Sequence, residues 1–322
     1  MSNSLSEADL PTLADVRRAA ARIRPFPRRT PVLTASSLDA LSGVKLFFKC
    51  ENFQRVGAFK FRGACNAVQS LSPAEAARGV ATHSSGNHGA ALALAARLRG
   101  ARCTVVVPRN APTVKRAAVA AYGADVVLCE PTLEARERTL AEAVADSGQV
   151  VVHPYDDARV IAGQGTAALE LVEDVPDLDV VLVPIGGGGL ASGTALAVRG
   201  ISPGPRVVAV EPLGADDAYR SFQAGERLPS VAPDTIADGL LTSLGVRNFE
   251  LVRRHVDDIV RVSEGAIVRA MRLLWERMKI VVEPSGAVPL AALLDGAVEG
   301  LAGQRIGIVL SGGNVDLDRL PW

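Results

Sequence analysis

The stretch "DVVLVPIGGGGLASGTALAVRG", residues 179–200, decides the fold class. No residue between 180 and 198 is charged, and this is nearly the length of a membrane-spanning helix. Pro184 and the four glycines at 186–189 would break such a helix. The stretch therefore predicts a buried strand, a glycine turn and a helix, which is the unit of a parallel α/β protein and implies no membrane.

The rest of the chain repeats this alternation. The apolar runs "GVATH", "RCTVVVP", "ADVVLCE" and "QVVVHP", between residues 79 and 154, predict buried parallel strands. Segments rich in alanine and leucine separate them and end near glycine, as helices do. We predict a two-domain α/β fold, with a parallel-sheet large domain (residues 1–70 and 155–322) and a smaller inserted α/β domain (residues 71–154).

Composition excludes several functional classes. The chain of 322 residues carries 35 basic and 35 acidic residues, so its charge offers no attraction for nucleic acid or an anionic membrane. Its four cysteines, Cys50, Cys65, Cys103 and Cys129, are far apart, which favours reduced thiols over disulfides or a zinc site. The polar N-terminus lacks a signal-peptide core, so a cytoplasmic protein is expected.

The glycine turn is typical of phosphate binding. Gly186, Gly187, Gly188 and Gly189 would let backbone N–H groups surround a phosphate at the positive end of a helix. A simple tight turn needs only one or two glycines. The turn also matches the G-x-G-x-x-A spacing of a dinucleotide site, with Glu211 near the position of a ribose-binding acid. An NAD-dependent oxidoreductase therefore stays open as an alternative.

A lysine stands between two phenylalanines in "ENFQRVGAFKFRGACNAV", residues 51–68. Lys60 could extend its amine to solvent from a surface helix. Buried, it would tend to lose its proton and become the nucleophile that an aldehyde cofactor needs. The choice between these interpretations depends on what else faces it.

Two further turns follow predicted strands. Ser84, Ser85, Gly86 and Asn87 precede a helix, and their donors could bind a carboxylate or a cofactor oxygen, whereas helix capping would need only one serine. In "VLSGGNVDL", residues 309–317, Ser311 directly follows a strand.

One ligand suits all of these features together. Pyridoxal phosphate carries an aldehyde for Lys60, a phosphate for the four glycines, and a hydroxyl and a ring nitrogen for the Asn87 and Ser311 turns.

The motifs "GAFKFRGA", "SSGNHG", "AGQGT", "GGGGL" and "SGGN", in this order, resemble the fold-type II pyridoxal-phosphate enzymes. The similarity is greatest to the serine/threonine dehydratase and serine racemase family, which includes threo-3-hydroxyaspartate dehydratase-like members. By this resemblance Lys60 is the Schiff-base lysine and a base, Phe59 flanks the cofactor ring, and Asn87 holds its hydroxyl oxygen. The glycines at 186–189 bind the phosphate, and Ser311 meets the ring nitrogen.

The resemblance implies α,β-elimination of water from a small 3-hydroxy L-amino acid, such as serine, threonine or threo-3-hydroxyaspartate, to give a 2-oxo acid and ammonia. Serine racemase with a side dehydratase activity is the alternative within the family, and it would use Ser85 as a second acid/base. Tyr155, where mammalian racemases carry asparagine, favours dehydration. Ser84, Ser85, Asn87 and His88 are expected around the substrate, and a homodimer is expected by family analogy.

Two more sites are implied. "VEPLGADDAY", residues 210–219, resembles a divalent-cation site with Glu211, the Ala215 carbonyl and Asp217 as ligands for Mg²⁺ or Ca²⁺. Arg136 matches an arginine at the active-site mouth, where it could bind a second substrate carboxylate. Otherwise Arg136 is a solvated charge on a helix that also carries Glu134 and Glu137.

Overall fold

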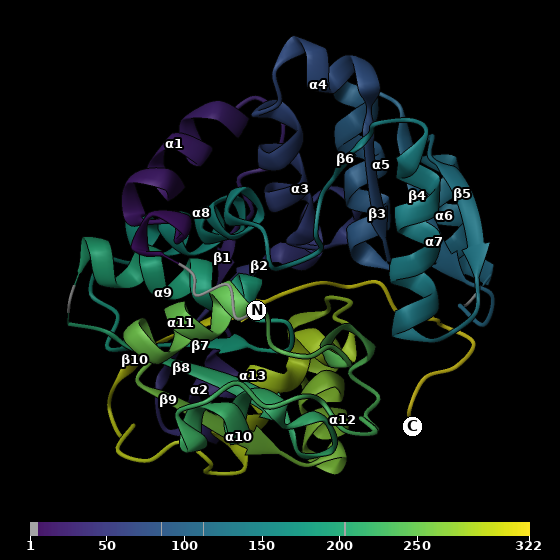
Figure 1. Ribbon diagram of the computed structural model, residues 1–322. Coiled ribbons are helices and arrows are strands. Elements are labelled where there is room, and N and C mark those ends of the chain that lie inside the picture. The colour runs from purple at the N-terminus through teal and green to yellow at the C-terminus, as the bar shows by residue number, and fades with distance from the viewer. Residues whose placement is uncertain (1–5, 85, 112, 203) are drawn as a thin grey trace.

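Two β-sheets organise the chain (Figure 1), which a computed structural model describes for residues 6–84, 86–111, 113–202 and 204–322. Among these residues the larger sheet has six strands, and β1 pairs antiparallel with β2 while the other neighbours are parallel. In sheet order they are β1 (Val32–Leu33), β2 (Lys45–Cys50), β10 (Arg305–Leu310), β7 (Val180–Pro184), β8 (Arg206–Pro212) and β9 (Asp258–Val262).

The smaller sheet comes from the middle of the chain. Its strands are all parallel, in the order β5 (Asp125–Cys129), β4 (Cys103–Pro108), β3 (Val80–His83) and β6 (Val150–Val151). The predicted α/β fold with an inserted smaller sheet is confirmed. Helix α3 (Lys60–Gln69) packs on helices of both units, so the domain boundary at residue 70 stays a prediction.

Helices cover both faces of each sheet (Figure 1), as parallel strands buried on both faces require. One face of the larger sheet packs on α2 (Ser36–Ser42), α12 (Glu264–Leu273) and α13 (Pro284–Leu294). The other packs on α1 (Leu13–Ile23), α8 (Ala158–Asp174), α9 (Gly189–Ile201), α10 (Asp217–Ala224) and α11 (Val246–His255). The smaller sheet packs on α3, α5 (Asn87–Arg99) and α6 (Thr113–Ala121) on one face and α7 (Leu133–Ala145) on the other, and α4 (Pro73–Arg78) follows α3.

The motif "AGQGT" proves to be a helix-packing element. A Cβ on Gly163 of α8 would lie 2.6 Å from the Cα of Gly63 in α3, so the two backbones touch. The neighbouring Gln164 accepts a hydrogen bond from the Gly63 N–H at 3.1 Å, which satisfies a free donor in the first turn of α3. The motif therefore fixes the turn of α3 that begins with Lys60.

Two other expectations concern the whole chain. The four cysteines are free and buried, as predicted. Within the described ranges, no helix has both the length and the apolar character needed to cross a membrane.

Candidate active site

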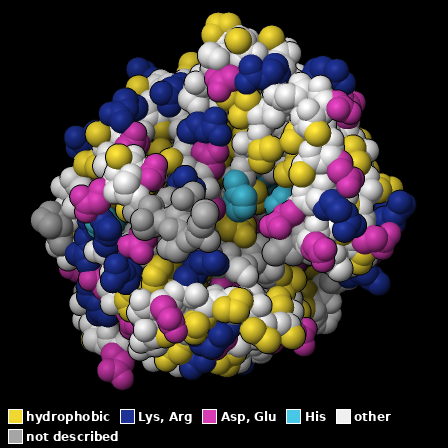
Figure 2. Space-filling view, viewed as in Figure 1, with side chains coloured by type: hydrophobic (Ala, Val, Ile, Leu, Met, Phe, Trp, Pro, Cys, Tyr) yellow, Lys and Arg dark blue, Asp and Glu magenta, His cyan; other side chains and the backbone are white. Residues whose placement is uncertain are grey.

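A cavity of about 270 Å³ lies where β3, β7 and β10 end, and residues of both sheets line it. Parallel α/β sheets place their ligand sites at this edge. Figure 2 shows histidine side chains near the centre of the view, and His83 and His88 are among the residues that line the cavity. Of the predicted site residues, the cavity wall contains Phe59, Lys60, Ser84, Asn87, His88, Arg136, Gly186, Gly187, Gly188, Gly189 and Ser311.

Lys60 is the first residue of α3, and its Nζ donates to the Pro154 carbonyl at 2.9 Å. Burial lowers the pKa of Lys60 to about 8, although the charge of Glu283 opposes the shift. The chain has five lysines. Among the lysines whose side chains the structure describes, Lys60 is the one that lines the cavity. A far larger fraction of this amine is unprotonated near neutral pH than of an ordinary lysine.

The segment before Lys60 is held by the turn after β10. The Phe59 N–H donates to the Ser311 carbonyl at 3.0 Å, and the Gly313 N–H donates to the Gly57 carbonyl at 2.9 Å. Val56 has a φ of 56°, which is rare for a β-branched residue, and its carbonyl accepts a bond from the Asn314 amide at 2.7 Å. Two motifs far apart in the sequence thus form one support for the lysine.

The four-glycine turn presents backbone N–H groups that could bind a ligand. Within the described part of the chain, the N–H groups of residues 186–189 have no hydrogen-bond partner. They lie at the N-terminus of α9, where Gly188 has a φ of 91°. A Cβ on Gly187 would lie 2.4 Å from the Tyr155 ring, so side chains are excluded from the turn. Free donors at a helix N-terminus suit a phosphate.

Glu283 is a cavity residue that the sequence did not reveal. It is 3% exposed and precedes α13, and it accepts bonds from the Asn87 amide at 3.0 and 3.2 Å. The Asn314 amide donates to the other end of Asn87, at its Oδ1, at 2.9 Å. An acid between Val282 and Pro284 was the only signal, and 196 positions separate it from Asn87.

The turn after β3 carries the predicted substrate groups. The Ser84 hydroxyl accepts a bond from the Gly86 N–H at 3.2 Å, and Ser85 lies outside the described residues. His88 is 3% exposed, and burial followed by the charge of Lys60 lowers its pKa well below the usual value. His88 is therefore neutral near pH 7 and contributes no charge to the cavity.

Arg136 reaches the cavity from α7. Its Nε is buried, and its side chain has no hydrogen-bond or ion-pair partner among the described residues. The exposed acid Glu134 pairs with Arg138 instead. Burial, and then His153 and Arg136, lowers the pKa of His83 to about 4, so His83 is neutral near pH 7 and Arg136 is the charged side chain that α7 brings to the cavity.

The predicted cation ligands lie apart from the cavity wall. The Glu211 carboxylate is fully buried and accepts the Ala218 and Tyr219 N–H groups at 3.1 and 2.8 Å. Asp217 accepts the Leu244 N–H at 2.8 Å with one oxygen, while its Oδ1 is buried without a partner. Burial raises the pKa of both carboxyl groups.

The predicted cation site has only two carboxylates and a backbone carbonyl. No group of three or more His, Cys, Asp and Glu side chains that could hold a metal occurs in the described part of the chain. The predicted site has two such side chains, Glu211 and Asp217, which is fewer than three. The bound metal therefore stays a prediction.

The family model described as "Pyridoxal-phosphate dependent enzyme" matches residues 23–312. The chain belongs to this family. It is 54% identical over 313 residues to the beta-hydroxyaspartate dehydratase of Paracoccus denitrificans, covering 97% of this chain and 99% of the relative.

Solved structures agree with the family assignment. The serine racemase of Dictyostelium discoideum has a TM-score of 0.91 at 49% identity, with 95% of this chain and 99% of that chain covered. The processed form of threonine deaminase isoform 2 from Solanum lycopersicum has a TM-score of 0.90 at 32% identity, with 96% and 85% covered.

These similarities confirm three predictions: the fold-type II architecture, dependence on pyridoxal phosphate, and membership of the dehydratase and racemase group as an ammonia-lyase. The alternative of an NAD-dependent oxidoreductase is wrong. Glu211, its proposed ribose-binding acid, is fully buried and bonded to backbone N–H groups, so it cannot reach a nucleotide.

Proposed function

We propose that the chain removes water from threo-3-hydroxyaspartate and releases 2-oxosuccinate and ammonia. The water lost in the elimination balances the water used to hydrolyse the resulting imine. The observation that carries the choice of substrate is Arg136, a guanidinium on the cavity wall with no described ion-pair partner. A guanidinium binds a carboxylate through two parallel hydrogen bonds, and 3-hydroxyaspartate has a second carboxylate where serine has none.

The residues of the cavity fit the cofactor. Lys60 would hold the aldehyde, the free N–H groups of residues 186–189 would bind the phosphate, and Phe59, Asn87 and Ser311 would surround the ring. When bound, pyridoxal phosphate supplies an electron sink for negative charge at the carbon next to the substrate amine. Once the substrate amine takes its place at the aldehyde, the freed Lys60 amine, with its pKa lowered to about 8, would accept the α-proton from that carbon.

The test of the substrate compares two amino acids in one variant. Arg136→Met should lower kcat/KM for threo-3-hydroxyaspartate by about 10²-fold, because a charge-assisted bidentate contact is lost. Its kcat/KM for L-serine should change little, since serine lacks the second carboxylate. Arg138→Met, on the same helix but 60% exposed at its side chain, is the matched control. Equal losses on both substrates would refute the proposal.

Racemisation is a proposed minor activity, supported by the similarity to serine racemases. Return of a proton to the opposite side of the substrate needs a second acid/base, and by resemblance this is Ser85. Ser85→Ala should retain most 2-oxo acid formation and lose D-amino acid formation. Unchanged D-amino acid formation would remove Ser85 from the mechanism.

A divalent cation at Glu211, the Ala215 carbonyl and Asp217 is also proposed. Two buried carboxylates and the unpartnered Asp217 Oδ1 suit Mg²⁺ or Ca²⁺. Leu244, whose N–H bonds to Asp217, would contact a Cβ on Gly188 at 2.7 Å, so the site adjoins the glycine turn. Chelation should lower thermal stability and Mg²⁺ should restore it, whereas Glu211→Gln should abolish this response. The homodimer and the cytoplasmic location stay predictions.

A further inference from the structure

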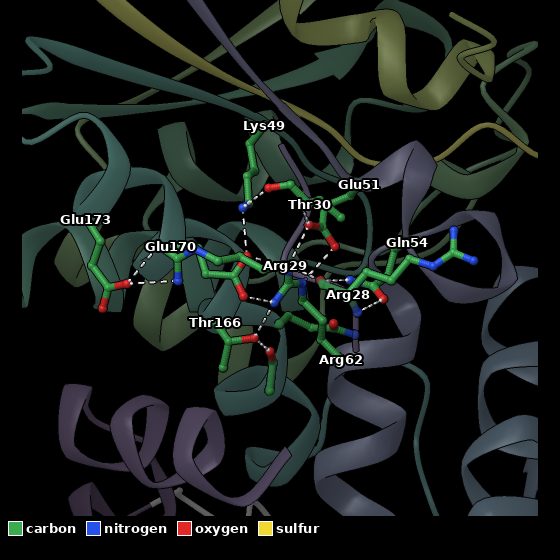
Figure 3. Close-up of polar contacts among 12 residues, drawn as sticks. Arg28, Arg29, Thr30, Lys49, Glu51, Gln54, Arg62, Thr166, Glu170 and Glu173 are labelled. Carbon is green, nitrogen blue, oxygen red and sulfur yellow. Dashed lines mark hydrogen bonds and ion pairs between the residues drawn. The ribbon is translucent and has the colours of Figure 1, made fainter. Parts of the chain in front are cut away.

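A cluster of buried charges lies behind the first turn of α3 (Figure 3). Arg62, Lys49 and Glu51 are fully buried, and the side chain of Glu170 is 15% exposed. Two cations and two carboxylates give the cluster no net charge. Its members come from α3, the end of β2, the segment after β2, and α8.

All five N–H groups of Arg62 are used. They contact Glu51 at 2.7 and 2.8 Å, both oxygens of Glu170 at 2.8 Å, and the Thr166 hydroxyl at 3.2 Å. Burial opposes the charged guanidinium, but Glu51 and Glu170 together outweigh burial, and the pKa of Arg62 is raised. The planar Arg62 side chain therefore holds α3 to two carboxylates at once.

Lys49 joins the cluster from a different element. Its Nζ donates to Glu170 and to the Thr30 carbonyl, both at 2.7 Å. Lys49 lies on β2 and has no contact with α3 through this amine, although it is as buried as Arg62. The cluster thus contains one cation that holds α3 and one that does not.

Arg62 follows Lys60 by two positions. Two residues span about 200° of an α-helix, so these side chains leave α3 on nearly opposite sides. Figure 3 shows Arg62 among its carboxylate partners, while the Lys60 Nζ bonds to Pro154 on the cavity side. Glu170 stands seven positions after Gly163, so α8 holds α3 at two points on one face: the glycine contact and the ion pair.

We propose that Arg62 is a positioning residue for Lys60, which fixes the rotation of the first turn of α3 so that the amine stays in the cavity. The proposal rests on the proposed role of Lys60. A lysine at position 62 would keep the charge but lose the two bidentate contacts, and the turn could then rotate. Because a displacement of about 1 Å can cost about 10²-fold in rate, such a rotation should be measurable at the cofactor.

The experiment uses three variants of the full chain. Arg62→Lys should weaken the affinity of the apoenzyme for pyridoxal phosphate by at least about 10-fold, shift the absorption band of the bound cofactor, and lower kcat by about 10²-fold with a smaller change in KM. Glu51→Gln keeps the shape of a single Arg62 partner and should show the same changes to a smaller extent. Lys49→Met is the matched control, and it should lower Tm while leaving the affinity, the band and kcat near wild type.

Two results would overturn the proposal. In one, Arg62→Lys and Glu51→Gln lower Tm like Lys49→Met and leave the cofactor band and affinity unchanged. In the other, Lys49→Met shifts the band as much as Arg62→Lys. If Arg62→Lys does not fold, the cofactor band and affinity of Glu51→Gln test the proposal alone. Borohydride reduction and peptide mapping of the wild type test the role of Lys60 separately from the positioning role of Arg62. A cofactor fixed to another lysine would refute the role of Lys60 itself.

Discussion

Lys60 and Arg62 are two cations on one turn of α3, Lys60 half-buried and Arg62 fully buried, and their surroundings differ completely. Arg62 contacts two carboxylates and donates all five of its N–H groups. Lys60 has one hydrogen bond, to a neutral carbonyl, and no carboxylate within ion-pair distance among the described residues. Burial lowers the pKa of Lys60 to about 8, whereas the pKa of Arg62 is raised.

The difference teaches that pairing decides what a buried charge can do. A paired cation keeps its proton and ties elements together, while an unpaired one is driven toward its neutral and nucleophilic form. Arginine suits the first role because its pKa is too high for it to lose its proton in a protein. Lysine suits the second because its amine can react with an aldehyde.

The largest expected effect comes from removing the unpaired amine. Lys60→Ala should lower 2-oxo acid formation by at least about 10³-fold, because the cofactor anchor and the base are lost together. Borohydride should then fix no pyridoxal phosphate to the chain. Retention of a tenth of the activity would show that another group does this chemistry.

The paired cation should show the opposite pattern in stability. Arg62→Met should destabilise the apoenzyme by about 3–5 kcal/mol, because two buried carboxylates lose their partner. Lys60→Met should not destabilise it at pH 7, since the desolvated ammonium is removed without leaving a carboxylate unpaired. Urea unfolding of both variants at pH 7 measures these changes in stability. Equal losses in the free energy of unfolding would contradict the comparison.

A smaller effect follows from the lowered pKa of Lys60. Between about pH 8 and the ordinary lysine value of 10.5, the unfolded chain binds more protons at this group than the folded chain does. The wild-type apoenzyme should therefore gain stability relative to Lys60→Met as the pH rises through this window, and the advantage of the variant should be greatest below pH 8. Lys45→Met, which removes a lysine side chain that is 67% exposed, is the matched control.

Local patterns predicted the sheets and much of the cavity wall. Apolar strands and glycine turns depend on neighbours in the chain, and parallel strands bring their carboxyl ends to one edge, so Asn87, Ser311 and the glycine turn could be placed together.

The ion cluster and Glu283 were not predictable from such patterns. Arg62 meets Glu170 across 108 positions, and Asn87 meets Glu283 across 196, with no periodicity to link them. The sequence singled out Lys60 inside an apolar segment, but only the tertiary structure shows that Arg62 has carboxylate partners.

The central claim is that Lys60 is a half-buried amine with a lowered pKa, and the pH dependence of cofactor capture tests it most directly. The neutral amine is the reactive form, so the rate at which the apoenzyme captures pyridoxal phosphate should rise with pH and level off above about pH 8. Peptide mapping after borohydride reduction should place the captured cofactor on Lys60. A rate that keeps rising to a midpoint near the ordinary lysine value of 10.5 would contradict the claim.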